Sequence, residues 1–158
     1  MKIQKTTVKD AIDVIYRLDC EAYTEEITTK QWYLNRYDGR ECVYLAVDEK
    51  QGVVAYFAVM DIKEPMKTAI ENGVLDGDVV VSNNMFQGDG RYFYMASCVV
   101  DKSFRRRGVF KMLFNAVMED YRGKFLCALA NEKTTLPLLE AGFRIVCNNG
   151  HYNSLVRD

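Results

Sequence analysis

Near the middle of this chain a long apolar strand runs into a basic turn, a glycine and an amphipathic helix, and this stretch is the most informative part of the sequence. We predict the strand over residues 92–100 and the helix over residues 108–121, with Arg105, Arg106 and Arg107 in the turn between them. The first N–H groups of a helix have no intrahelical acceptor and lie at the positive end of the helix dipole. Gly108 lets the backbone approach a ligand closely. The segment therefore predicts a phosphate or pyrophosphate site.

The basic turn is also compatible with two different roles. Neither GxxxxGK[ST] nor GxGxxG occurs, so the predicted site is not of the P-loop or Rossmann kind. The three arginines can equally be a solvated turn without a ligand, and residues 102–111 can be a basic patch that binds nucleic acid. The net charge of -1 gives no general reason for that last partner, so we expect no nucleic acid.

The rest of the chain predicts a mixed α/β fold in one domain over residues 1–158. Apolar residues at helical or strand spacing set the expected elements. Helices are expected over residues 8–23, 28–37, 64–71, 108–121 and 136–141, the last with Pro137 in its first turn, and strands over residues 3–6, 42–47, 53–60, 79–81, 92–100, 125–130, 143–147 and 151–156.

Residues 63–91 form an insert between the third and fourth main strands. Segments this long inside a compact domain are usually functional or disordered.

Composition predicts a globular protein of the cytoplasm. Apolar residues make up 49% of the chain, and no apolar run is long enough to cross a bilayer. No signal-type apolar stretch follows the first residues, and the five scattered cysteines are expected to be buried free thiols in a reducing compartment. We expect no membrane partner.

Two motifs resemble those of the GNAT N-acetyltransferase superfamily. Residues 105–110, Arg-Arg-Arg-Gly-Val-Phe, resemble its acyl-CoA pyrophosphate loop, Q/R-x-x-G-x-G/A. Asn131 and residues 138–143 resemble its second motif, N-x6-Y-x3-G-F, in the family's order and spacing. The resemblance implies an α/β fold with a central mixed, mostly antiparallel sheet flanked by helices. It also implies acetyl-CoA as the acyl donor and no metal.

The resemblance further implies where the donor binds. The pantetheine arm would lie along the end of the strand and pair with backbone groups of Cys98, Val99 and Val100, and the N–H of Cys98 would hold the oxyanion. The loop and helix start would hold the pyrophosphate, and Asn131 would contact the cofactor as well. A primary amine of a small molecule or peptide would attack the thioester directly. We expect the insert over residues 63–91 to cover part of the side where this acceptor binds and to help choose the substrate. The residues implied around the pyrophosphate are Arg105, Arg106, Arg107, Gly108, Val109, Phe110 and Lys111.

Three departures from the family pattern concern the loop and the acid–base chemistry. Phe110 replaces the last Gly or Ala of the loop, which keeps the backbone N–H and predicts a side chain packed in the core. Leu138 stands where the family often has a proton-donating tyrosine. Tyr94 stands where some members carry a glutamate base, although a tyrosine there is more often a core or wall residue. Water, Tyr94, Glu25, Glu26 or a carboxylate of the insert can then serve as the base.

Several weaker patterns are better explained by ordinary structural roles. Glu25 and Glu26 can hold a cationic amine or lie in a solvated loop, and the aromatic group Trp32, Tyr33 and Tyr37 can line a pocket or pack under a helix. A nucleophilic pair of Cys98 and His151 is conceivable, but a lone histidine on a late strand is more often structural. No CxxC or HxxxH occurs, and Asp76, Asp78, Asn83 and Asn84 lack EF-hand spacing, so we expect no metal.

A second class of function remains open. The chain can be a non-catalytic acyl-CoA-binding or protein-interaction module on the same fold. A homodimer through the exposed edge of the final strands is a further prediction.

Overall fold

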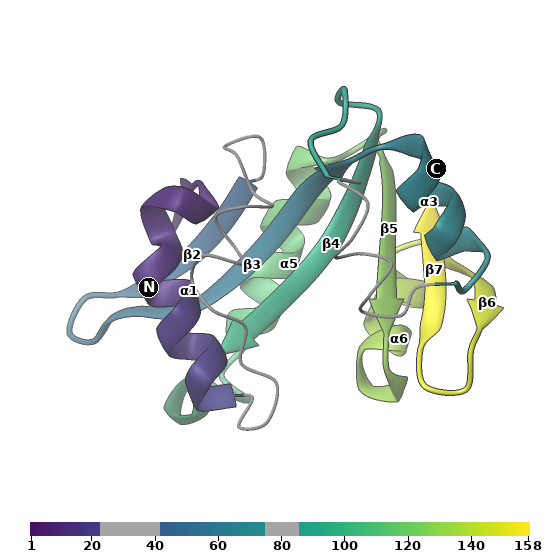
Figure 1. The fold of residues 1–158 in the computed structure, drawn as a ribbon. Helices are drawn as coiled ribbons and strands as arrows, with labels where there is room; N and C mark the ends of the chain where they lie inside the picture. The colour runs from purple at the N-terminus through teal and green to yellow at the C-terminus, as the bar shows by residue number, and fades with distance from the viewer. Residues whose placement is uncertain (23–41, 75–85) are drawn as a thin grey trace. The chain divides into compact units, whose positions relative to one another are not determined.

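The computed structural model describes residues 1–22, 42–74 and 86–158 (Figure 1). The chain divides into two compact units. Unit 1 contains residues 1–59 and 97–120, and unit 2 contains residues 60–96 and 121–158. Strands β3 (Gly52–Ile62) and β4 (Tyr92–Val100) each contribute residues to both units.

The strands are hydrogen-bonded in the order β1-β2-β3-β4-β5-β7-β6. The β4–β5 pair is parallel, whereas β1–β2, β2–β3, β5–β7 and β6–β7 are antiparallel. The expected mixed, mostly antiparallel sheet is confirmed. The remaining strands are β1 (Lys2–Thr6), β2 (Cys42–Asp48), β5 (Phe125–Ala130), β6 (Arg144–Asn148) and β7 (Asn153–Arg157).

The helices of the described residues match the expected ones closely, with one exception. Helix α1 covers Val8–Ala22, α3 covers Glu64–Glu71, α5 covers Val109–Asp120 and α6 covers Glu132–Glu140; a short 3-10 helix, η1, covers Lys102–Phe104. The exception is α6, which begins earlier than expected. Its start is fixed by Asn131, whose side chain caps the helix, so Pro137 lies inside the helix and not in its first turn.

In unit 1, helices α1 and α5 pack on opposite faces of β3 (Figure 1). Neighbouring strand residues point to opposite faces. Tyr56 reaches Asp19 on α1 with its hydroxyl, while the ring of Phe57 lies 6.3 Å from that of Phe110 on α5. Phe110 also stacks on Phe114, with ring centroids 5.7 Å apart. Phe110 thus packs against Phe57 and Phe114, but it is half-buried and lies at the margin of the core that was expected for it.

A three-residue contact links β1, β2 and α5 within unit 1. The hydroxyl of Tyr44 donates to Asp120 Oδ2 at 2.7 Å, and Lys5 forms an ion pair with the same oxygen. The hydrogen bond from Lys5, followed by that from Tyr44, holds the pKa of Asp120 below its usual value.

We predict that Asp120 contributes to acid denaturation. Its folded-state pKa is lowered, so the carboxylate stabilises the native state above the unfolded pKa, near 3.8, and this contribution is lost as the pH falls below it. Asp120→Asn should therefore lower the free energy of unfolding by less than about 1 kcal/mol at neutral pH, because the pair is partly exposed. Urea unfolding of both proteins should show the difference shrinking below about pH 4; an unchanged difference would contradict the assignment.

In unit 2, the described part of the insert is a core element. Helix α3 packs on β5 and β7, and its Met66 and Ile70 are fully buried. Lys67 lies 5.2 Å from the ring centroids of both Tyr92 and Phe125. This part of the insert therefore builds unit 2, and deleting it would open the core. That the insert covers the acceptor and chooses the substrate stays a prediction, as does the single-domain organisation.

Two further expectations are corrected by the structure. His151 lies in the turn between β6 and β7, not on a strand, because β7 begins only at Asn153. All five cysteines are free, as expected, but only Cys127 is buried; the other four are partly exposed. Strand β6 is last in the strand order, and the homodimer through its edge stays a prediction.

Some expected features lie outside the described residues. These are the second helix with Trp32, Tyr33 and Tyr37, the loop residues Glu25 and Glu26, the strand at 79–81, and the residues Asp76, Asp78, Asn83 and Asn84.

Candidate functional site

The basic turn of unit 1 is fixed at its start by backbone contacts. The N–H of Asp101 donates to the carbonyl of Val54 on β3 at 2.8 Å. The Asp101 carboxylate in turn accepts from the N–H and the hydroxyl of Ser103, at 2.8 and 2.6 Å, and so caps η1. The turn therefore leaves β4 in a defined direction and reaches α5 without a long linker.

Helix α5 begins with N–H groups outside its hydrogen-bond ladder, as the sequence predicted. The first bond of the ladder runs from the N–H of Met112 to the carbonyl of Gly108, at 2.9 Å. The N–H groups of the residues from Gly108 to Lys111 precede that bond and have no acceptor in the ladder. Gly108 is exposed and has a φ of 79°, and a Cβ added to it would meet no atom of the described residues within 4 Å. This helix start is open to an anion.

Basic side chains surround the same helix start. Arg105, Arg106, Arg107 and Lys111 are all exposed. Arg105 donates from Nε to the carbonyl of Val100 at 3.1 Å, and the Arg107 guanidinium lies 5.2 Å from the centroid of the Phe104 ring. Together with the N–H groups, these side chains form a positively charged, solvent-exposed cluster of hydrogen-bond donors. Such a cluster fits a phosphate or pyrophosphate.

Arg106 holds a backbone conformation that costs stability. Its φ is 62°, in the left-handed region that a Cβ disfavours by about 1–2 kcal/mol. We predict that Arg106→Gly raises the free energy of unfolding by about 0.5–1 kcal/mol. Arg106→Ala, which removes the same charge but keeps the Cβ, should not. Equal urea midpoints for the two variants would show that the strain has no energetic consequence.

Strand β4 extends past the end of its pairing with β5. The parallel ladder joins Tyr92–Met95 to Phe125–Ala128 and ends there. Residues 96–100 of β4 continue beyond it, and they include Cys98, Val99 and Val100. Backbone N–H and C=O groups past the end of a ladder can pair with an extended ligand.

The thiol of Cys98 is poorly suited to nucleophilic catalysis. Although Cys98 keeps part of its surface exposed, its surroundings largely bury the thiol, and this burial raises the pKa of Cys98 to about 12. The thiol is therefore protonated at neutral pH. Burial is the cause of this shift, with no contribution from a histidine. The pairing of Cys98 with His151 as a nucleophilic couple is therefore not supported, and only the backbone of Cys98 is a candidate for the chemistry.

Tyr94 is equally poorly suited to act as a base. It lies on the paired part of β4 in unit 2, opposite Cys127. Burial, with smaller effects of Cys127 and Tyr152, raises the pKa of the Tyr94 phenol. The hydroxyl therefore stays protonated at neutral pH and holds its proton more tightly than an exposed tyrosine, so it is not available as a base.

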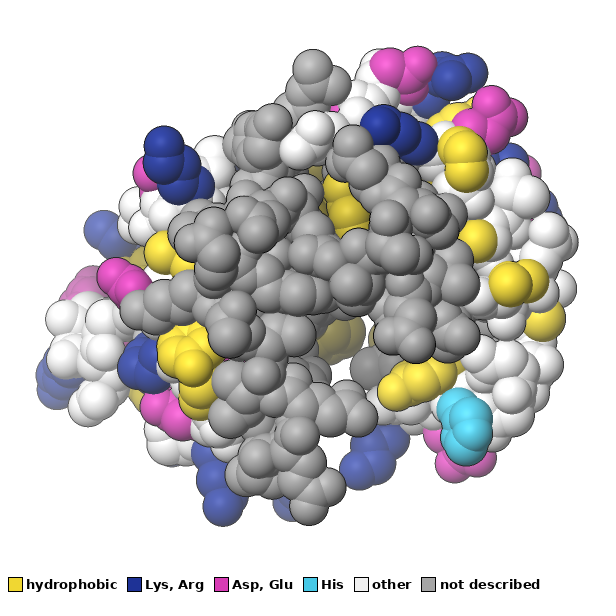
Figure 2. Space-filling model, viewed as in Figure 1, with side chains coloured by type: hydrophobic (Ala, Val, Ile, Leu, Met, Phe, Trp, Pro, Cys, Tyr) yellow, Lys and Arg dark blue, Asp and Glu magenta, His cyan; other side chains and the backbone are white. Residues whose placement is uncertain are grey.

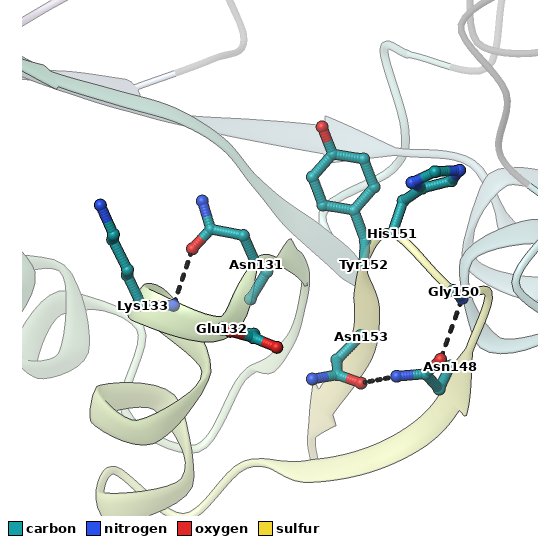
Figure 3. A pocket seen from close by; sticks show the side chains of 9 residues that line it. Asn131, Glu132, Lys133, Asn148, Gly150, His151, Tyr152 and Asn153 are labelled. Atoms are coloured by element: carbon teal, nitrogen blue, oxygen red, sulfur yellow. Dashed lines mark hydrogen bonds between the residues drawn. The ribbon is translucent and has the colours of Figure 1, made fainter.

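Asn131 has a structural task that the motif did not reveal. Its Oδ1 accepts from the N–H groups of Lys133 and Thr134, at 3.0 and 3.1 Å, and so caps α6. Figure 3 shows its amide nitrogen turned away from the helix. A contact from that nitrogen to a cofactor stays a prediction.

A polar pocket of about 440 Å³ lies at this end of unit 2 (Figure 3). The start of α6 forms one wall and the turn between β6 and β7 forms the other. The single histidine of the chain is exposed beside it (cyan in Figure 2). The lining offers amide, imidazole and phenol groups that can hydrogen-bond a small polar ligand; it comprises Ala130, Asn131, Glu132, Lys133, Asn148, Gly150, His151, Tyr152 and Asn153.

The structure also brings together three residues that the sequence analysis missed. The Tyr56 hydroxyl donates to Asp19 Oδ1 at 2.5 Å and lies 3.0 Å from Ser97 Oγ. Asp19 and Tyr56 are 7% and 2% exposed, so this is a buried carboxylate with a hydroxyl chain that ends on β4. One signal was available: Asp19 follows Ile15 by one helical turn and so falls on the apolar face of α1.

Among the residues of ranges 1–22, 42–74 and 86–158, no group of three or more His, Cys, Asp or Glu side chains is placed to hold a metal. Glu25 and Glu26, the other carboxylates considered for the acceptor amine, lie outside these ranges.

The fold is mixed α/β, and β4 is joined to α5 by a turn with exposed basic side chains. A family model for the acetyltransferase (GNAT) family matches residues 12–143. The chain therefore belongs to the GNAT acetyltransferase family. A search of curated proteins finds no sequence match.

Solved structures with this fold are similar over nearly the whole chain. NAA60 of Arabidopsis thaliana in complex with acetyl-CoA matches with a TM-score of 0.61 at 15% identity, over 98% of this chain and 96% of its own. An acetyltransferase from Thermus thermophilus matches with a TM-score of 0.62 at 16% identity, over 99% of this chain and 97% of its own. The ribosomal-protein-S18-alanine N-acetyltransferase of Escherichia coli matches with a TM-score of 0.62 at 9% identity, over 98% of this chain and 91% of its own. At these identities the likeness establishes the fold.

None of the helices in the described part of the chain is long and apolar enough to cross a membrane. A cytoplasmic location stays a prediction.

Proposed function

We propose that this protein transfers an acetyl group from acetyl-CoA to a primary amine of a small molecule or peptide, by direct attack of the amine on the thioester. The observation that carries the proposal is the junction of β4 with α5. A strand end past its ladder and an open, basic helix start follow one another closely along the chain. That is the arrangement an extended pantetheine arm ending in a pyrophosphate requires.

Each part of the donor then has a candidate partner in unit 1. The backbone of Cys98, Val99 and Val100 pairs with the pantetheine amides. The N–H groups from Arg107 to Phe110 bind the pyrophosphate oxygens, with Arg105, Arg106 and Lys111 supplying charge. The Cys98 N–H donates to the thioester carbonyl as it becomes an oxyanion.

One property of the donor and one similar structure support this assignment. Acetyl-CoA is a direct acyl donor, so transfer needs no enzyme nucleophile, and the protonated thiol of Cys98 agrees with that. The similar plant protein NAA60 was solved in complex with acetyl-CoA.

A non-catalytic acyl-CoA-binding or protein-interaction module is the second candidate function. The observation that favours it is Leu138, which is buried where the family often has a proton-donating tyrosine. A thiolate leaving in water can be protonated by solvent, so this residue does not decide between the two functions.

The two functions differ in whether free CoA appears. With acetyl-CoA and a panel of amines, including ethylamine, hydroxylamine and a short peptide with a free N-terminus, we expect amine-dependent release of CoA thiol and an acetylated product by mass spectrometry. Tight acetyl-CoA binding without release for any amine would leave the binding module as the function.

A further inference from the structure

We propose that Ser97, Tyr56 and Asp19 form a proton relay that takes the proton from the acceptor amine. This inference rests on the proposed acetyl transfer and gives that reaction the acid–base residues that the motifs did not supply. All three residues belong to unit 1 and come from three elements, β4, β3 and α1.

The direction of the hydrogen bonds follows from the geometry. Tyr56 has a single hydroxyl proton, and it is donated to Asp19 Oδ1 at 2.5 Å. The contact of 3.0 Å between Tyr56 and Ser97 must then be donated by Ser97. The hydrogen bonds therefore run from Ser97 through Tyr56 to the Asp19 carboxylate. A proton that follows them moves inward from β4.

The outer end of the relay lies at the proposed reaction centre. Ser97 directly precedes Cys98, whose N–H is the proposed oxyanion donor, and consecutive Cα atoms are about 3.8 Å apart. Ser97 is partly exposed, whereas the two inner members are buried. It also lies past Met95, where the β4–β5 ladder ends. An amine that attacks a thioester held at Cys98 thus approaches within reach of Ser97 Oγ.

Two protons leave the nitrogen, and each has an acceptor. The ammonium gives the first to Ser97 Oγ, Ser97 gives its own to Tyr56, and Tyr56 gives its own to Asp19. The neutral amine nitrogen then forms its bond to the acetyl carbon, the carbon–sulfur bond breaks, and CoA leaves as the thiolate. The second N–H proton of the adduct goes to that thiolate, and the proton held by Asp19 returns to solvent.

Arg17, the basic residue of α1 closest to Asp19 in the sequence, contacts other groups. Arg17 lies 3.3 Å from Glu21 and 3.9 Å from Asp101, and it donates to the carbonyl of Val53 at 2.7 Å. One contact of Asp19 is with Tyr56 from β3, which in turn contacts Ser97 from β4. A buried carboxylate that is connected to the end of β4 by two hydroxyl groups is suited to acid–base catalysis.

The test compares an amine that is protonated at neutral pH, ethylamine, with one that is neutral, hydroxylamine. The variants are Ser97→Ala, Tyr56→Phe and Asp19→Asn. Each should lower kcat/KM for ethylamine about 100-fold or more, with recovery as the pH rises and ethylamine loses its proton unaided. Transfer to hydroxylamine should fall much less, and the affinity for acetyl-CoA should stay that of the wild type.

Tyr44→Phe is the matched control, because Tyr44 is also a buried tyrosine that donates to a helix aspartate, Asp120, in unit 1. It should leave the ratio of the two amines and the pH profile unchanged. If the relay variants lose both amines equally, with a wild-type pH profile, or keep wild-type rates, the relay is overturned while acetyl transfer stands. If the wild type binds acetyl-CoA but acetylates neither amine, the proposed transfer fails, and the relay fails with it.

Discussion

Gly108→Glu should abolish acetyl-CoA binding, with a loss in affinity of at least about 100-fold, equivalent to about 2.7 kcal/mol. The substitution places a carboxylate at the open start of α5, where the pyrophosphate is proposed to lie. Repulsion between like charges and the loss of close backbone approach act in the same direction. Space is not the cause, because a Cβ at Gly108 meets no described atom within 4 Å.

Gly123→Glu is the control for this variant. Gly123 has a φ of 74° against 79° for Gly108, and its Cβ would likewise have open space among the described residues. The two substitutions therefore carry the same charge change and a similar backbone strain. Calorimetric titration should find wild-type affinity for Gly123→Glu. Comparable losses in both variants would mean that strain or net charge, and not the helix start, governs binding.

Gly88→Ala should destabilise the protein by about 2–4 kcal/mol. An added Cβ would lie 2.2 Å from the carbonyl oxygen of Ile62 and 2.4 Å from Asp61 Oδ1. The carbonyl is backbone and cannot rotate away, and the nearby N–H of Gly88 is bonded to the Asp61 carbonyl at 3.3 Å. The chain must shift at the point where the insert returns to β4.

Gly90→Ala separates crowding from backbone strain in the same segment. Gly90 has a φ of 83° but open space around its Cβ within the described structure, so its substitution should cost only about 1–2 kcal/mol. Urea unfolding should give a clearly lower free energy of unfolding for Gly88→Ala than for Gly90→Ala. The reverse order would show that the close approach of Gly88 to Ile62 does not limit stability.

Local patterns in the sequence were enough for the elements that carry the proposed donor site. The apolar run of β4 has the bounds that were expected, and the glycine before α5 marks the helix start to within one residue. Both signals are local, since a buried strand and an amphipathic helix each show their own periodicity. The packing of Phe110 against Phe57 followed from its place on the apolar face of that helix.

Errors arose where a strong local signal competed with a weaker one. Pro137 predicted a helix start because proline favours the first turn, but the Asn131 side chain caps the helix well before Pro137. His151 was assigned to a strand because apolar residues follow it, although the Asn149 side chain accepts from its N–H at 3.1 Å and holds it in a turn. Side-chain capping of this kind leaves little trace in an apolar pattern.

The proton relay was beyond reach of the sequence for a different reason. Asp19, Tyr56 and Ser97 are far apart in the chain, and each looks ordinary in its own segment. Only the pairing of β3 with β4 and the packing of α1 bring the two hydroxyl groups and the carboxylate together. Contacts of this kind depend on tertiary structure and carry no local motif.

The position of the donor site can be tested directly by amide hydrogen exchange with and without saturating acetyl-CoA. Backbone pairing at the end of β4 and phosphate binding at the start of α5 predict slower exchange in residues 97–100 and 107–111. Unchanged exchange in both segments, or slowing confined to residues 130–133 and 148–153 around the polar pocket, would contradict the proposed donor site.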